Sequence, residues 1–262
     1  GIEGYIPAMH VEGAAYASVI AQVVMAIISL VLLLKKTAIS LRLSFTLHAE
    51  VPRLLNMIGN LFIRTIALNV ALYLATSYAT DYGKEYIAAY TISINIWLLG
   101  AFMIDGYSSA GNILSGKLLG AKEYKSLVIL SNKLFKYGIV IGTIIAVLGA
   151  VFYNAIGRIF TNETLVLEQF YTVFWIVLIT QPINAITFIF DGMFKGMGEM
   201  KYLRNLLILA TGLVFVPTLL IFDYLNYKLI AIWLAFTCWI IARGLPLVFK
   251  FRKKFIPLAE NQ

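Results

Sequence analysis

Residues 168–194 read EQFYTVFWIVLITQPINAITFIFDGMF, and this stretch decides the class of fold. From Gln169 to Phe190 no side chain carries a charge. A run of this length crosses a bilayer as a helix, because about 20 apolar residues at a rise of about 1.5 Å each match a hydrocarbon core about 30 Å thick. We therefore expect residues 168–194 to form a membrane-spanning helix with Pro182 near its middle.

The composition of the whole chain supports the same conclusion. Of its 262 residues, 61% are hydrophobic and only 13% are charged, and the mean hydropathy is +0.86. A soluble domain carries about a quarter charged residues, so we exclude a soluble domain with a single core. The formal net charge of +8 does not indicate nucleic-acid binding, because the basic residues lie between apolar runs and form no single basic stripe.

Six further apolar stretches make seven in all, so we expect an all-α integral membrane protein. The expected spans are residues 13–34, 52–80, 85–117, 136–156, 168–194, 205–222 and 229–249. Residues 37–51 form an amphipathic linker that we expect along the membrane surface. Basic residues concentrate after the first, third, fifth and seventh spans, whereas the alternate connections hold only Lys84, Arg158 and Lys228. By the positive-inside rule the N-terminus faces outward, and the C-terminal tail, 257–262, is cytoplasmic.

Away from the ends of the expected spans, four charged residues stand out: Arg64, Asp105, Asp191 and Arg243. Each costs roughly 2.5–3.5 kcal/mol to insert near the centre of a spanning helix, so each needs a partner or a function. We expect Asp105 and Asp191 to carry a proton or cation, or else to be solvated near a membrane surface, with Lys195 as an alternative partner of Asp191. Arg243 lies close enough to the end of its span for its side chain to extend to the interface instead.

One face of the second span is polar. Asn56, Asn60 and Arg64 are spaced i, i+4, i+8 and therefore share a side of the helix. Arg64 lies roughly 16 Å along the helix from Arg53, well inside the membrane. Such a face contacts protein or water rather than lipid. We expect Arg64 either to pair with a buried carboxylate or to contact substrate.

The fifth span carries a second polar face, formed by Gln181, Asn184 and Asp191. Pro182 lies beside it, and a proline inside a helix tends to kink it. We expect a hinge or a cavity lining at this point. Glycine pairs at a spacing of four are expected to pack helices closely: Gly116 and Gly120, Gly138 and Gly142, and Gly192 and Gly196.

Signatures of enzymes are missing from the sequence. It contains no Gly-rich phosphate loop, His-Glu-x-x-His motif or nucleophile elbow. Its two histidines, His10 and His48, fall outside the expected spans, and Cys238 is its single cysteine. We therefore expect neither an enzyme nor a metal site, and no cofactor other than a coupling ion.

Short motifs in a characteristic order cover nearly the whole chain. They are GAAYASVIAQ (13–22), AAY (88–90), DG (105–106), GKLLGA (116–121), RIFT (158–161), QP to DG (181–192), IW (232–233) and Arg243. In this order they resemble the sixth helix, the eighth helix and its following loop, the segment before the tenth helix, the tenth helix and the twelfth helix of multidrug and toxic compound extrusion (MATE) transporters. Arg64 in the seventh-helix position and the two Asp-Gly pairs are most similar to the DinF-like branch.

The resemblance implies helices six to twelve of a twelve-helix protein built from two six-helix lobes. Residues 1–36 would then hold the last helix of the N-lobe and residues 52–256 the six-helix C-lobe, with most of the N-lobe a missing partner outside this chain. Family members expel organic cations and other amphipathic compounds in exchange for protons or sodium ions. We accordingly expect a multidrug efflux antiporter of the bacterial cytoplasmic (inner) membrane, in contact with lipid and small cationic or amphipathic substrates.

One departure from the family pattern affects the coupling ion. Some members carry an acidic residue in the seventh helix as part of a cation site, whereas the corresponding face here has Asn56, Asn60 and Arg64. This replacement disfavours a sodium site. It shifts the expected coupling site of the C-lobe to Asp191, with Asp105 and Arg64 as partners.

Two other functions stay open on the sequence alone. A related lipid-linked oligosaccharide flippase has similar lobes and a cationic cavity, and Arg64 would then contact a pyrophosphate. A seven-helix receptor fits the number of spans and the outward N-terminus. Against a photoreceptor, the seventh span lacks a central lysine for a retinal Schiff base.

Overall fold

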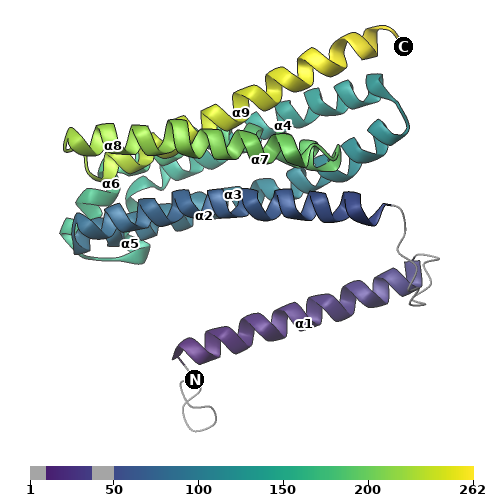
Figure 1. Ribbon diagram of the computed structural model, residues 1–262. Helices are drawn as coiled ribbons and strands as arrows, with labels where there is room; N and C mark the ends of the chain where they lie inside the picture. Colours follow the sequence, from purple (N-terminus) through teal and green to yellow (C-terminus); the bar gives the residue numbers. More distant parts are fainter. Residues whose placement is uncertain (1–9, 37–49) are drawn as a thin grey trace. The chain divides into compact units, whose positions relative to one another are not determined.

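The computed structural model describes residues 10–36 and 50–262 and builds them from helices (Figure 1). Within these residues, seven helical segments are long and apolar enough to cross a membrane, which confirms the predicted number of spans and the all-α fold. The chain divides into two compact units, residues 1–51 and 52–262. It is therefore a multi-pass membrane protein with one spanning helix in the first unit and six in the second.

The first unit contains α1 (His10–Lys36), which includes the first predicted span. The helix ends at Lys35 and Lys36, where basic side chains complement the negative end of the helix dipole. The predicted amphipathic linker at 37–51 lies outside the described residues except for Glu50 and Val51.

The second unit is a bundle of long helices joined by short turns (Figure 1). Its elements are α2 (Val51–Asp81), α3 (Lys84–Gly120), α4 (Tyr124–Val151), α5 (Tyr153–Phe160), α6 (Thr164–Gly196), α7 (Met200–Leu209), a π-helical segment (Ala210–Phe215), α8 (Val216–Tyr224) and α9 (Leu229–Glu260). Together α7, the π-helical segment and α8 form one span. In the turn from α2 to α3, Gly83 adopts a φ of 126°, a conformation that favours glycine.

Helix α6 is the central helix of this unit and packs against α3, α4 and α9. It is also the most deeply buried of the candidate spans, with 67% of its most apolar stretch inside the protein. Large side chains such as Phe170, Phe174 and Phe194 are almost fully buried there. The polar residues Thr180, Gln181, Asn184, Thr187 and Asp191 of α6 are all buried, so they face other helices and not lipid.

Glycines let the neighbouring helices approach α6 closely, as predicted. A Cβ atom on Gly116 of α3 would lie 2.7 Å from the carbonyl oxygen of Gly196. A Cβ atom on Gly142 of α4 would lie 2.5 Å from the Cα atom of Pro182. Neither distance is compatible with a side chain, so backbone packs against backbone at both points. Gly120 is an exception, since a Cβ atom there would have no neighbour within 4 Å.

Helix α4 begins at Tyr124, well before the predicted start at residue 136. The prediction omitted the first turns because Lys133 and its charged neighbours interrupt the apolar run. The inner face of these turns is nevertheless apolar, and both Leu127 and Leu134 are buried. The helix therefore continues beyond the hydrocarbon as a packed stem, which a limit based on apolar length does not detect.

The short helix α5 (Tyr153–Phe160) was not predicted as a separate element. Its first residues were assigned to the end of the fourth span. The Tyr153 hydroxyl donates to the carbonyl oxygen of Tyr171 at 2.6 Å, and the Tyr171 hydroxyl donates to that of Asn154 at 2.9 Å. These two bonds fasten α5 against the start of α6. With eight residues it is too short to span a bilayer.

The π-helical segment ends at Phe215, two residues before Pro217 in the first turn of α8. Proline has no backbone N–H and clashes with the preceding turn of an α-helix, so a wider turn accommodates it within a continuous span. The segment also presents the Thr211 hydroxyl to the indole N–H of Trp239, which donates to it at 3.0 Å. A local backbone distortion thereby connects this span to α9.

The end of the bundle at the α2–α3 turn has its own polar contacts. The hydroxyl of Tyr82 donates to the Asp223 carboxylate, and Nζ of Lys228 donates to the Tyr86 hydroxyl at 3.1 Å. Burial and the bond to Asp223 raise the pKa of Tyr82, so the phenol stays protonated. The α2–α3 turn is thus attached to the turn between α8 and α9.

Candidate functional site

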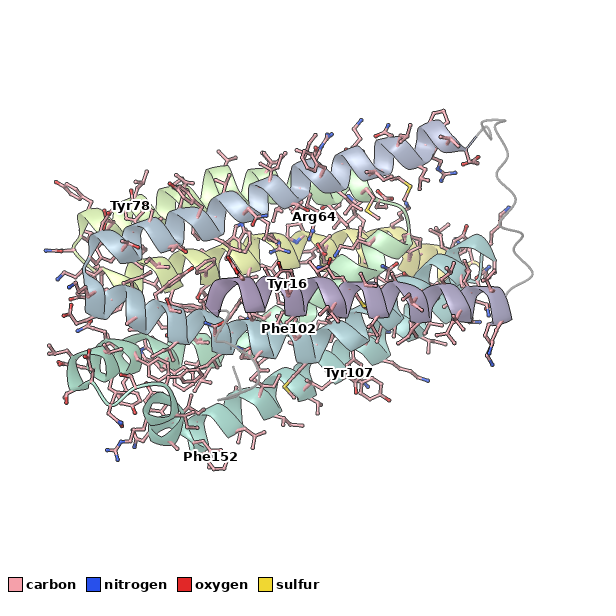
Figure 2. All side chains as sticks on the ribbon, turned by 90° about the horizontal axis from the view of Figure 1, so that it is seen from below. Tyr16, Arg64, Tyr78, Phe102, Tyr107 and Phe152 are labelled. Atoms are coloured by element: carbon pink, nitrogen blue, oxygen red, sulfur yellow. The ribbon has the colours of Figure 1, made fainter. Side chains whose placement is uncertain are left out.

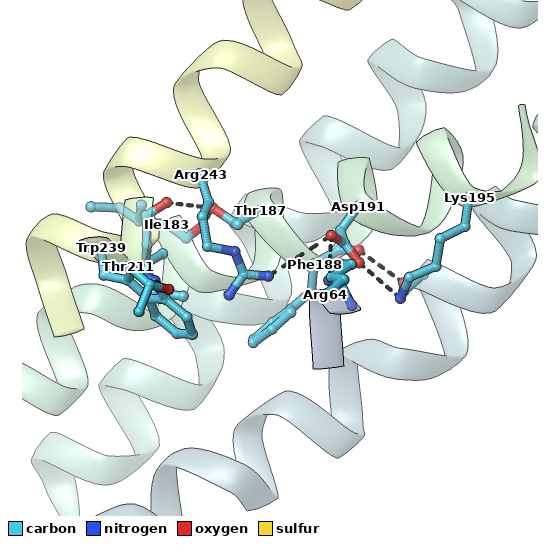
Figure 3. Close-up of polar contacts among 11 residues, drawn as sticks. Arg64, Ile183, Thr187, Phe188, Asp191, Lys195, Thr211, Trp239 and Arg243 are labelled. Atoms are coloured by element: carbon cyan, nitrogen blue, oxygen red, sulfur yellow. Dashed lines mark hydrogen bonds and ion pairs between the residues drawn. The ribbon is translucent and has the colours of Figure 1, made fainter. Parts of the chain in front are cut away.

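Three of the four charged residues predicted inside the spans meet at Asp191 of α6, which is only 4% exposed (Figure 3). Its Oδ1 accepts a hydrogen bond from Nη2 of Arg64 on α2 at 2.6 Å. Its Oδ2 lies 2.8 Å from Nζ of Lys195, one turn along α6, and its Oδ1 lies 3.8 Å from Nη2 of Arg243 on α9. These four residues, here called the charged cluster, join three helices that are distant in sequence.

An aromatic side chain holds Arg243 in place. Its guanidinium carbon lies 4.5 Å from the centre of the Trp239 ring, a cation–π geometry. Trp239 is in turn fixed by its bond to Thr211. Arg243 is only 3% exposed, so the expectation that its side chain reaches the interface is wrong. The nearby carboxylate and the indole ring stabilise the charge inside the bundle instead.

The charged cluster contains more positive than negative charge. Arg64, Lys195 and Arg243 contribute three formal positive charges and Asp191 one negative charge, which leaves two positive charges in excess. The Lys195 side chain is 31% exposed, whereas the two arginine side chains are 10% exposed or less. Within the described residues, Nε of Arg64 and Nη1 of Arg243 have no hydrogen-bond partner. The electrostatics of the cluster therefore favour an anion and oppose a further cation.

A seam of polar residues separates the two apolar clusters of the core. On α9, Ile240 belongs to one cluster and Leu247 to the other, with Arg243 between them. On α6 the division falls between Leu178 and Ala185. The polar groups are therefore grouped at one level of the bundle and not scattered along it.

Gln181 and Asn184 occupy this seam on α6, and each is 1% exposed. Their side-chain amide atoms have no hydrogen-bond partner among the described residues, and so no bond joins them to the charged cluster. Gln181 lies against Gly100 of α3, where a Cβ atom would be 2.8 Å from its Oε1. Buried amides without partners cost free energy. Gln181 and Asn184 thus place unsatisfied polar groups at the same level of the bundle as the charged cluster.

Asn56 and Asn60 lie on α2 before Arg64 but do not contact Asp191. Nδ2 of Asn60 donates to both the carbonyl oxygen and Oδ1 of Asn56, each at 2.6 Å. Asn60 is buried and Asn56 is exposed. Figure 2 shows Arg64 projecting from α2 toward the interior of the bundle. Of the predicted stripe on α2, only Arg64 joins the charged cluster.

Asp105 is not brought to the charged cluster. It lies on an exposed side of α3 together with Phe102, which is 71% exposed, and Ser109. The adjacent Ile104 is 1% exposed and faces the core. Asp105 takes part in none of the ion pairs that the described residues form around Asp191 and Glu199. It is a separate carboxylate on a different face, inside the span Lys84–Gly120.

Three residues that support Arg64, Asp191 and Arg243 were not among the predicted site residues: Lys195, Trp239 and Thr211. Lys195 was considered only as an alternative partner of Asp191, although its i, i+4 position on the same helix face indicated contact. Trp239 stands four residues before Arg243, a spacing that also places two side chains on one face. The hydroxyl of Thr211 carries no comparable signal, because its orientation depends on the π-helical segment.

A second group of charged residues lies at the turn between α6 and α7. Glu199, in the turn between α6 and α7, binds Nζ of Lys250 at 3.1 Å and Nζ of Lys254 at 2.9 Å, both from α9. Partial burial disfavours the charged form of Glu199, but the hydrogen bonds and charges of the two lysines outweigh it and lower its pKa. The carboxylate therefore connects the α6–α7 turn to α9 when it is ionised.

Glu199→Gln is expected to lower the melting temperature of the purified protein at neutral pH. Because the pKa of Glu199 is lower in the folded than in the unfolded protein, the stabilisation is present above the ordinary value of 4.5 and is lost as the pH falls through the folded pKa. The difference between wild type and variant should therefore be constant near neutral pH and shrink in acid. Glu163→Gln is the control, and an equal loss with it, or a difference that is independent of pH, would contradict the interpretation.

Comparison with known proteins agrees with this architecture. The MatE family model matches residues 61–221. Protein DETOXIFICATION 42 of Arabidopsis thaliana is 28% identical over 90% of this chain and 45% of its own length. DNA damage-inducible protein F of Escherichia coli strain K12 is 26% identical over 94% of this chain and 54% of its own length. The chain thus spans about half the length of the curated relatives it matches.

Solved structures show the same fold. The outward-facing conformation of a multidrug resistance MATE family transporter of the MOP superfamily superimposes with a TM-score of 0.82, at 20% identity. The match covers 95% of this chain and 57% of that one. The predicted resemblance to MATE proteins is confirmed by the family model, which covers more than half of the chain. This chain belongs to the MatE family.

Proposed function

We propose that this chain forms the C-terminal part of a secondary active efflux transporter, which exchanges small amphipathic or cationic substrates for protons. Membership of the MatE family supports transport as the activity. The observation that carries the proposal is the buried ion pair between Arg64 and Asp191, which joins α2 to the central helix α6. Ionisable residues inside a membrane are costly and mark the pathways of substrates and ions.

The occupied surroundings of Asp191 support protons over sodium as the coupling ion, because basic groups already contact both carboxylate oxygens. A sodium ion at Asp191 would have to lie beside three cations that already surround the carboxylate within 2.6–3.8 Å. A proton needs no coordination shell and adds to a single oxygen. The absence of an acidic residue beside Arg64 on the polar face of α2 points the same way.

Proton uptake at Asp191 would loosen the contact between α2 and α6. A neutral carboxyl no longer compensates the buried guanidinium groups of Arg64 and Arg243, and the positive charge in excess rises from two to three. Such a state is unfavourable in a medium of low dielectric constant, unless a cation moves toward water or an anion enters. Protonation and displacement of α2 are therefore coupled, as alternating access requires.

A cationic substrate would bind away from the charged cluster, and Asp105 is the candidate contact. Its carboxylate lies within the span of α3 on an exposed side, one turn from the exposed ring of Phe102. An acid next to an aromatic ring matches a lipophilic cation, which gains both an ion pair and a cation–π contact. In this proposal Asp191 serves coupling and Asp105 serves recognition.

The distribution of basic residues supports an orientation with the C-terminus in the cytoplasm. The end of α9 carries Lys250, Arg252, Lys253 and Lys254, and the turn after α6 is followed by Lys201 and Arg204. These connections lie at the same end of the bundle, which by the positive-inside rule faces the cytoplasm. We place the protein in the cytoplasmic membrane of a bacterium.

A second candidate is the flipping of a lipid-linked oligosaccharide. The two positive charges in excess at the cluster favour it, because a diphosphate would neutralise them. The burial of Arg64 and Arg243 counts against direct access to so large a headgroup. Transport of a lipophilic cation by the reconstituted protein, without transport of lipid diphosphates, would exclude this candidate.

Asp191→Asn in the complete protein should abolish substrate accumulation driven by a pH gradient in proteoliposomes. The amide cannot take up a proton, so the gradient no longer drives the movement of α2. Substrate exchange without a gradient should persist, and it also shows that the variant has folded despite its unpaired arginines. Asp81→Asn neutralises an exposed carboxylate outside the cluster and should behave as wild type. Gradient-driven accumulation at the wild-type rate in the Asp191 variant would remove Asp191 from the coupling step.

Asp105→Asn should raise the KM for tetraphenylphosphonium by about fivefold, the size of effect expected for one partly exposed ion pair. The KM for an uncharged amphipathic substrate should not change, because only the charge is removed. Ser109→Ala, one turn along the same side of α3, is the matched control. If the KM values for the cation and the uncharged substrate rise together, Asp105 shapes the helix and does not recognise charge.

A further inference from the structure

A groove runs along the side of the bundle between α4, α6 and α9. Its volume is 420 Å³, and α9 forms one wall from Ile241 to Arg252. Phe135 of α4 and residues of α6 complete the lining. Leu245 and Phe249 on its rim are 53% and 68% exposed, so the groove opens sideways to the surroundings of the bundle. A groove that opens sideways from a membrane-spanning bundle can admit a lipid chain.

The lining is apolar except at one end. Thr187 lines the groove, but its hydroxyl donates to the carbonyl oxygen of Ile183 at 2.9 Å. The hydroxyl therefore has no proton left to donate to a ligand. Arg252 is exposed at the end of the groove that is nearer to the C-terminus, with its guanidinium carbon 5.7 Å from the Phe135 ring. A single cation therefore stands at the mouth of an otherwise apolar channel.

The length of the groove matches one leaflet. From Ile241 to Arg252 the helix advances by about 16 Å, at about 1.5 Å per residue. Half of a hydrocarbon core about 30 Å thick is about 15 Å. If Arg252 lies at the membrane surface, Ile241 lies close to the midplane. An acyl chain that follows α9 would fill the groove while its headgroup stays at the surface.

The charge at the mouth is not balanced by a neighbouring acid. On one face of α9, Lys250 and Lys254 are both paired with Glu199. Arg252 points to the opposite face, toward α4, and none of the ion pairs formed by the described residues includes it. A guanidinium group suits a phosphate, to which it donates two parallel hydrogen bonds.

We propose that this groove is a binding site for an anionic glycerophospholipid, with one acyl chain along α9 and the phosphate at Arg252. The lining connects the site to the charged cluster, since Gly244 follows Arg243 directly and Thr187 lies one turn before Asp191. Gly244 also packs closely on Thr187, where α9 meets α6. A bound lipid stabilises the contact of these two helices at the level of the cluster.

Native mass spectrometry of the complete protein, titrated with phosphatidylglycerol or phosphatidylcholine of equal chain length, tests this site. Wild type should bind phosphatidylglycerol about tenfold more tightly than phosphatidylcholine. Phosphatidylglycerol has a net negative charge that attracts Arg252, whereas the choline group of phosphatidylcholine cancels the charge of its phosphate. Arg252→Gln should remove this preference. Lys253→Gln removes one positive charge at the neighbouring position and should leave the preference for phosphatidylglycerol unchanged. Inorganic phosphate should not compete, which distinguishes a lipid site from a phosphate site.

A variant that fills the groove tests whether an acyl chain binds there. Val248→Trp should weaken the binding of both lipids by a similar factor, while its circular dichroism spectrum stays that of a folded helical protein. The proposal is overturned if wild type shows no preference, if Arg252→Gln and Lys253→Gln reduce it equally, or if phosphate competes. All of these measurements are independent of transport, so their failure would leave the proposed efflux function untouched.

Discussion

A carboxylate in the interior of a membrane protein has to be neutralised, and the arrangement of this bundle follows from how Asp191 meets that requirement. Its partners come from α2 and α9 as well as from α6 itself. The helices α3 and α4 are attached to α6 differently, through glycines that bring backbone against backbone, as at Gly116 and Gly142. These backbone contacts at glycines are rigid, whereas an ion pair is lost when its carboxylate takes up a proton. The helix α2 is accordingly the part of the bundle that protonation of Asp191 can release.

The spans were predictable because each depends on a local property, an apolar run long enough to cross a bilayer. The elements that escaped prediction depend on contacts instead. The stem of α4 is held by Leu127 and Leu134, and α5 by its bonds to Tyr171, neither of which an apolar count detects. The π-helical segment ends just before Pro217, and its wider turn accommodates the proline within the span. Local composition therefore determined which segments enter the membrane, but not how each one ends.

The candidate site was predictable in part, because a charge inside a span requires a partner. That rule selected Arg64, Asp191 and Arg243, and the family resemblance added Arg64 as an expected partner of Asp191. The structure joins these two residues, which stand 127 residues apart, but it does not bring Asp105 to them. The same rule did not distinguish Asp191 from Asp105, since both are aspartates inside a span and both are followed by a glycine. Gly192 packs tightly against α3, whereas a Cβ atom on Gly106 would have no neighbour within 4 Å. The same dipeptide is buried in one helix and exposed in the other, and only the packing around it decides which.

The central claim is that the contact between α2 and α6 depends on the protonation of Asp191. The most direct test is the distance between spin labels at Phe62→Cys on α2 and Ile179→Cys on α6, both exposed positions, in a background from which Cys238 and any other native cysteine have been removed. Double electron–electron resonance on the complete protein should show a second, distinct distance as the pH is lowered. In Asp191→Asn the distribution should no longer respond to pH. A distribution that is independent of pH in the protein with native Asp191, or a shift that persists in Asp191→Asn, would contradict the account.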